Sequence, residues 1–126
     1  MVETCKDKHC AKHGSIRTHG RTFTATVLSA RAQNTAIVEW ERRYYVPKYE
    51  RYERRRTKIN AHNPECINAK PGDIVRISEC RPVSKTKHFV ITEKIGAERL
   101  FEERAAMLEE AKVKKKEVPE KAEEKT

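Results

Sequence analysis

The chain has 126 residues, a formal net charge of +9, and equal shares of 37% for hydrophobic and for charged residues. This composition suits one domain with a modest core, and the charge points to a polyanionic partner, most often nucleic acid, with an anionic membrane surface as the competing partner. No run of about 18 apolar residues could span a bilayer, and the N-terminus has no apolar signal segment. We therefore expect a cytoplasmic protein that does not cross a membrane.

Residues 1–17 are predicted to form a polar arm without helical or strand periodicity, which can bury little apolar surface. Such an arm is either disordered or held by something other than a core. Its cysteines and one histidine have a spacing close to that of tetrahedral zinc ligands. The candidate ligands of one structural zinc are Cys5, Cys10, His13 and, from a later loop, Cys66, with His9 and His19 as neighbouring alternatives. The competing interpretation is a mobile arm with free thiols whose histidines assist RNA binding.

Five segments between residues 18 and 96 are predicted to be β-strands, because apolar side chains alternate along them. They are residues 21–30, 35–46, about 52–62, a segment between Pro71-Gly72 and Arg81-Pro82, and a segment through Phe89, Ile91 and Ile95. Five short strands favour an all-β, five-stranded OB-fold barrel, which leaves no exposed edge. A flat meander is the alternative. Cys80, inside the fourth strand, is expected to be a buried core residue.

The turn between the second and third strands is unusually basic and aromatic. Residues 42–58 hold eight Lys or Arg against two Glu, together with all four tyrosines of the chain. We expect a long hairpin whose tip projects beyond the barrel, with some of its tyrosines in the core. Cations suit phosphates, and tyrosine or arginine planes can stack on splayed bases, so the pattern favours RNA. The candidate RNA-binding residues here are Arg42, Arg43, Lys48, Tyr49, Arg51, Tyr52, Arg54, Arg55, Arg56 and Lys58.

A second basic element follows the fourth strand. The corner between the last two strands carries hydroxyl and cationic side chains, and the simpler interpretation is a solvated turn. Its candidate phosphate-binding residues are Arg81, Ser84, Lys85, Thr86 and Lys87.

From Gly96 onward the periodicity becomes helical, and residues 97–117 are predicted to form a C-terminal helix. Its apolar stripe comprises Leu100, Phe101, Ala105, Leu108 and Ala111, with glutamates early and lysines late, as the helix dipole favours. We expect this stripe to pack on the barrel, with a partner-binding role as the alternative. Residues 118–126 are predicted to form a flexible charged tail.

The segment from Gly72 to Ser84 reads G-D-I-V-R-I-S-E-C-R-P-V-S and is followed by Lys85-Thr86-Lys87. It resembles the pattern of the family of the seventeenth protein of the small ribosomal subunit, and the resemblance extends over roughly residues 16–95. It implies an OB-fold protein that binds small-subunit ribosomal RNA and holds several RNA helices together. The P-K-Y-x-R-Y run of residues 47–52, the cations after it and the basic corner would contact that RNA.

The resemblance also implies other ribosomal proteins as partners, and no small-molecule substrate. The N-terminal arm resembles archaeal-type members, which gives no metal assignment. Two other functions are possible: a free-standing OB-fold protein that binds single-stranded nucleic acid, and a zinc-dependent enzyme acting on RNA. The sequence has no nucleophile–base pattern, phosphate-binding glycine loop or H-E-x-x-H motif, so we do not expect an enzyme.

Overall fold

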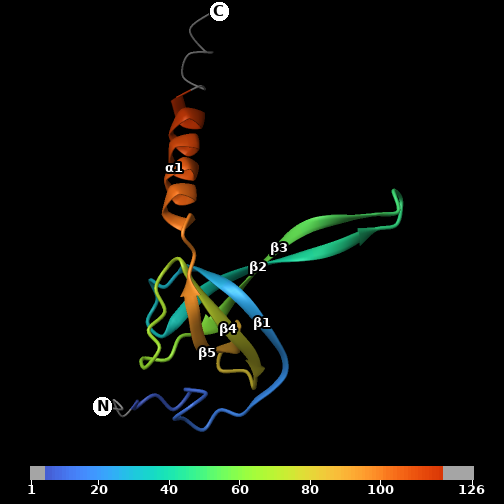
Figure 1. The fold of residues 1–126 in the computed structure, drawn as a ribbon. Coiled ribbons are helices and arrows are strands. Elements are labelled where there is room, and N and C mark those ends of the chain that lie inside the picture. Colours follow the sequence, from blue (N-terminus) through green and yellow to red (C-terminus); the bar gives the residue numbers. More distant parts are fainter. Residues whose placement is uncertain (1–4, 118–126) are drawn as a thin grey trace, which may run out of the picture.

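The computed structural model describes the backbone of residues 5–117 and the side chains of residues 5–112. Its elements are β1 (Thr18–Ser29), β2 (Thr35–Val46), β3 (Arg51–His62), β4 (Asp73–Cys80), β5 (Lys87–Ala97) and α1 (Phe101–Glu117). The strands close into a barrel in the order β1-β2-β3-β5-β4 (Figure 1). This is the predicted all-β OB-fold. The predicted flexible tail, residues 118–126, lies outside the described residues.

Two contacts between strands distant in sequence close the barrel. β1 pairs antiparallel with β4, and Phe23 lies opposite Ile77. β3 pairs parallel with the start of β5 over a short stretch in which Ala61 lies opposite Phe89. The meander alternative is therefore wrong, because a meander would leave β1 and β5 as open edges.

The core follows from the alternation of the strands. Its buried side chains come from the inward positions of all five strands: Ala25, Val27, Ala36, Val38, Ala61, Val75, Ile77 and Ile91. Phe23 and Trp40 stack against this cluster with ring centroids 4.8 Å apart. The alternation fails in β5, where Ile95 is 52% exposed and not inward as predicted. Register shifts in the β4–β5 ladder, between Ile74 and Val75 and between Arg76 and Ile77, disturb the two-residue period there.

The N-terminal arm buries more than its composition suggested. Ile16, only 5% exposed, joins Cys80 and Val90 in a second small apolar cluster. Cys80 is thus a buried core residue, as predicted. This contact places the end of the arm, next to β1, against the barrel.

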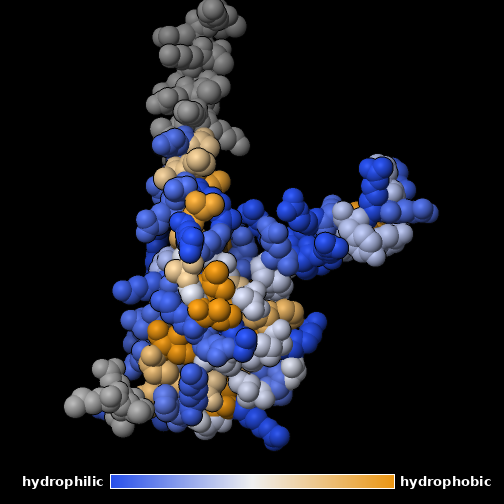
Figure 2. All heavy atoms as spheres, viewed as in Figure 1, coloured by the Kyte–Doolittle hydropathy of each residue, from blue (hydrophilic) through white to orange (hydrophobic). Residues whose placement is uncertain are grey.

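The helix does not pack on the barrel, so that expectation is wrong. α1 begins at Phe101 and stands away from the strands (Figure 1), and Leu108 is 61% exposed. Only its root is seated: the Glu98 N–H donates to the Gly72 carbonyl at 2.8 Å. Gly72 has a φ of +91°, which favours glycine, and a Cβ there would lie 3.0 Å from Cδ1 of Phe101. Glycine at position 72 therefore allows the Phe101 ring to approach the backbone this closely. Figure 2 shows apolar atoms exposed along the helix.

Asp73 in the turn before β4 gives a testable contribution to stability. Its buried carboxylate accepts hydrogen bonds from the Lys70 backbone N–H at 2.8 Å and from the Lys94 ammonium at 2.9 Å. Burial alone would raise the pKa of Asp73, but these two donors outweigh it and hold the pKa below 3.8. We expect Asp73→Asn to lower the free energy of unfolding by about 1.5–3 kcal/mol at pH 7, measured by urea denaturation.

The pH dependence of this loss has a definite sign. The pKa of Asp73 is lower in the folded state than in the unfolded state. The stabilisation by the Asp73 carboxylate is therefore fully present at pH values above the unfolded-state pKa, and it is lost as the pH falls through the folded-state pKa. The difference between wild type and Asp73→Asn should therefore be constant above about pH 5 and shrink below pH 3.8. Glu93→Gln is the control, since the Glu93–Arg76 pair is exposed and should contribute little. Equal losses in the two variants would contradict the assignment.

Candidate nucleic-acid interface and metal site

The hairpin of β2 and β3 is the most prominent projection of the protein. The two strands pair without a register shift over all twelve residues of each, from Thr35 opposite His62 to Val46 opposite Arg51. Only the root of this hairpin contributes to the barrel core, and the distal half extends into solvent (Figure 1). Hydrogen bonds from Tyr49 N to Val46 O and from Glu50 N to Pro47 O close its tip.

Every candidate RNA-binding residue on this hairpin is exposed. The tyrosines are exposed as well, from 38% for Tyr44 to 69% for Tyr52, so the expectation that some lie in the core is wrong. Instead they contact one another and the cations: the Tyr45 and Tyr52 rings lie 5.2 Å apart, and the Arg55 guanidinium lies 3.7 Å from the Tyr44 ring centroid. The hairpin therefore presents aromatic planes and positive charge together.

Acidic side chains neutralise the root of the hairpin. Glu39 lies 3.7 Å from Arg56 and 3.6 Å from Lys58, and Glu41 also lies near Arg56. Between Glu41 and the end of β3, the hairpin has two further acidic residues, Glu50 and Glu53. Positive charge without a nearby acid is thus concentrated in the distal half.

The predicted basic corner is the loop between β4 and β5. Arg81, Ser84, Lys85 and Thr86 are exposed, whereas Lys87 is half-buried and donates to the Thr35 hydroxyl at 3.1 Å. The Ser84 hydroxyl accepts the Lys87 backbone N–H and so shapes the loop. An open hollow of about 360 Å³ joins this loop to the hairpin root, lined by Ile37, Lys58, Ile59, Asn60 and Thr86. The two basic elements therefore border one continuous surface.

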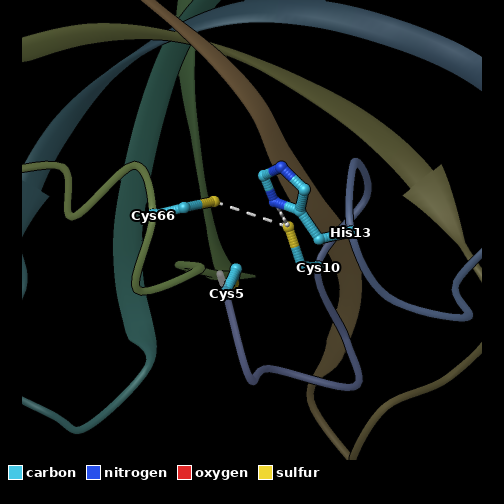
Figure 3. Close-up of side chains that lie close together, drawn as sticks. All are labelled: Cys5, Cys10, His13 and Cys66. Carbon is cyan, nitrogen blue, oxygen red and sulfur yellow. Dashed lines mark hydrogen bonds between the residues drawn. The ribbon is translucent and has the colours of Figure 1, made fainter. Parts of the chain in front are cut away.

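The structure brings together the four predicted metal ligands. The donor atoms of Cys5, Cys10, His13 and Cys66 all lie within 4.8 Å of one another (Figure 3). The Cys10 sulfur is 3.5 Å from that of Cys66 and 3.6 Å from Nδ1 of His13. A tetrahedral zinc site, with Zn–S of about 2.3 Å and Zn–N of about 2.0–2.1 Å, has donor–donor separations of about 3.5–3.8 Å. This group could therefore hold a metal ion.

The Cys10 and Cys66 thiols share one S–H···S hydrogen bond, in which either sulfur could hold the proton. Burial raises the pKa of Cys10, but the backbone N–H groups of His13 and Lys12 outweigh it and lower the pKa to about 7. Burial and the neighbouring Cys10 raise the pKa of Cys66 to about 12. Because Cys66 is solvent-exposed, we attribute most of the rise in its pKa to the Cys10 sulfur, which lies 3.5 Å from the Cys66 sulfur. A cation bound between the sulfurs would replace that proton.

Two further residues hold the ligand segments together, and sequence reasoning missed both. The Asp7 carboxylate accepts the His9 backbone N–H at 2.9 Å and contacts Nε2 of His62 at 2.5 Å. Both side chains are buried, so the pair joins the arm to the end of β3, four residues before Cys66. No sequence signal links positions 55 residues apart, since only the barrel brings them together. Gly14 completes the turn, because a Cβ there would lie 2.5 Å from the Lys8 carbonyl oxygen.

Comparison with known proteins decides the family. The sequence model of Ribosomal protein S17 matches residues 25–93. "Small ribosomal subunit protein uS17" of Methanocaldococcus jannaschii is 53% identical over 92 residues, which cover 73% of this chain and 79% of that relative. The Archaeoglobus fulgidus protein of the same name is 50% identical over 94 residues, 75% of this chain and 84% of that relative. The chain belongs to the ribosomal protein S17 family. It is a structural protein of the small ribosomal subunit and not an enzyme.

The match to the S17 family model includes both basic elements but only part of the candidate metal site. Residues 25–93 include the whole β2–β3 hairpin and the β4–β5 loop, so both basic elements lie inside the S17 domain. Of the four candidate metal ligands, only Cys66 falls within it. Within residues 5–117, no helix is long and apolar enough to cross a membrane.

Proposed function

We propose that this S17-family protein binds small-subunit ribosomal RNA through the β2–β3 hairpin and the β4–β5 loop and so clamps separate RNA segments. One observation carries the proposal: the hairpin projects beyond the barrel and carries exposed tyrosines among cations that largely lack acidic neighbours. Phosphates would be bound by arginine and lysine, and exposed tyrosine rings would stack on bases or ribose. Residues 18–96 would form the RNA-binding unit, with residues 1–17 as its metal-bearing arm.

The relatives support the cellular setting. They are named as small ribosomal subunit proteins, so we infer that this chain works on the ribosome in the cytoplasm, beside other small-subunit proteins and without a small-molecule substrate. A free-standing single-strand-binding protein is the alternative function. It is disfavoured because most of the candidate RNA-binding residues lie along a hairpin that projects beyond the barrel.

We also infer that Cys5, Cys10, His13 and Cys66 hold one structural zinc ion. The donor set and the separations between donor atoms support zinc. The ion would tie the arm to the loop after β3, which explains how a segment with one buried aliphatic side chain keeps a fixed place.

A salt titration tests RNA binding by the wild-type protein. If the hairpin and the loop together contact five or more phosphates, the logarithm of the association constant should fall with the logarithm of salt concentration with a slope of about −3.5 or steeper. Filter binding to small-subunit ribosomal RNA measures it, with unstructured RNA of equal length as the control. Equal affinity for the two RNAs would favour the single-strand-binding alternative.

A further inference from the structure

The distal hairpin has two faces of different chemistry, because alternate residues of a strand point to opposite sides. One face continues the line of Trp40 and Ile59, which pack against the barrel core, and we call it the inner face. It carries Arg42, Tyr44, Val46, Arg51, Glu53, Arg55 and Thr57. The outer face continues the line of Glu39 and Lys58 and carries Glu41, Arg43, Tyr45, Tyr52, Arg54 and Arg56.

Two of the three arginines of the inner face, Arg42 and Arg55, are already engaged within the protein, and the third, Arg51, lies at the tip. Arg55 pairs with Glu53 and lies over the Tyr44 ring at 3.7 Å. Arg42 donates through Nε to the Thr57 hydroxyl at 3.0 Å, and its guanidinium lies 5.8 Å from the Tyr44 ring centroid. These contacts fix both guanidinium groups, so binding a phosphate would require breaking them.

The outer face changes character along its length. At its root Arg56 and Lys58 are balanced by Glu39 and Glu41. At the next pair Arg43 lies directly opposite Arg54, and neither side chain has a hydrogen-bond, ion-pair or aromatic partner in the described part of the chain. Like charges directly opposite each other destabilise a strand pair. The next pair is Tyr45 opposite Tyr52, whose rings are tilted by 56°.

We propose that Arg43 and Arg54 form a two-arginine site for one RNA backbone phosphate, and that the Tyr45–Tyr52 pair receives the adjoining base or ribose. The inference rests on the proposed RNA binding and assigns it to one face of the hairpin. Each guanidinium offers a planar fork of donors that matches a phosphate, and an anion between the two removes their mutual repulsion. Neighbouring pairs on one face are about 6.5–7 Å apart, so the tyrosines lie within reach of a nucleoside attached to that phosphate.

Two charge-matched double variants test the assignment. Arg43→Ala/Arg54→Ala and Arg42→Ala/Arg55→Ala each remove two arginines from adjacent positions of the same strands, one pair from each face. We expect the outer-face variant to lose about 10- to 100-fold in affinity for small-subunit ribosomal RNA and to lower the magnitude of the salt slope by about 0.7–0.9, for one lost phosphate contact. The inner-face variant should retain the wild-type slope. Tyr45→Ala/Tyr52→Ala should weaken binding with the slope unchanged, because stacking releases few ions.

The free protein provides a second readout. Removing the unpaired like charges should leave the melting temperature of the outer-face variant equal to or above that of wild type, whereas the inner-face variant should melt lower. The assignment is overturned if the inner-face variant loses as much affinity as the outer-face variant, or if the outer-face variant keeps wild-type binding. The proposed function fails separately, if removing the whole distal hairpin leaves RNA binding intact.

Discussion

Replacing residues 43–54 by a two-residue Asn-Gly turn should lower the affinity for small-subunit ribosomal RNA by at least about 100-fold. An Asn-Gly turn matches the twist of the shortened strands, which would still pair at Arg42 and Arg55. The change removes four cations and all four tyrosines. Stacking of a base on an aromatic ring contributes about 1–3 kcal/mol, so two lost stacks alone amount to about 30-fold or more. With one phosphate shared by Arg43 and Arg54, three lost phosphate contacts should also reduce the magnitude of the salt slope by about 2–3.

The same change should leave the barrel intact, since the removed residues contribute nothing to its core. Thermal unfolding followed by circular dichroism checks this. A control matched in the number of cations lost keeps the hairpin and neutralises four exposed cations outside it: Lys12, Arg31, Lys70 and Arg99 to Ala. The control should lose much less affinity than the shortened hairpin. Similar losses in the two variants would mean that RNA binding depends on overall charge and not on the hairpin.

Removing zinc should release the N-terminal arm while the barrel stays folded. Structural zinc binds small peptides with an apparent free energy of about 10–16 kcal/mol at pH 7, comparable to or greater than the stability of a whole domain. Against this, the arm contributes the buried Ile16 and the partly buried Ala11 to a small apolar cluster, and Asp7 contributes one buried pair with His62. We therefore expect amide protons of residues 5–17 to lose most of their exchange protection on chelation or in Cys10→Ser. Protection in β1 to β5 should remain.

The fourth cysteine provides the matched control for this experiment. Cys80→Ala changes a buried cysteine that is not among the candidate ligands, and it should retain about one zinc per chain by native mass spectrometry. Cys10→Ser should retain none at nanomolar free zinc. Wild-type protein purified without chelator that contains no zinc, with its arm thiols freely alkylated, would contradict the metal assignment. Because the ligand thiols must lose protons, zinc affinity should also fall as the pH is lowered below 7.

Strand positions could be predicted because each depends on a local rule. The alternation of Ala36 and Val38 with Ile37 and Glu39 defines which face of β2 is buried, and Pro82 ends β4 since it cannot donate to a ladder. Where a local rule is interrupted, the prediction fails. Ile95 continues the pattern of β5 but lies outside, because register shifts in its pairing with β4 change which side chains face inward.

The sequence by itself indicated the five strands, the basic hairpin and the cysteine and histidine residues that could hold a metal ion, because these follow from periodicity, charge density and residue chemistry. Only the tertiary structure decided what those residues meet. Closure of the barrel brings Cys66 to Cys10 and His62 to Asp7, across more than fifty positions of the chain. The unbroken β2–β3 register separates the engaged Arg42 and Arg55 from Arg43 and Arg54. Such contacts depend on the closure and register of the whole sheet, and no stretch of sequence contains them.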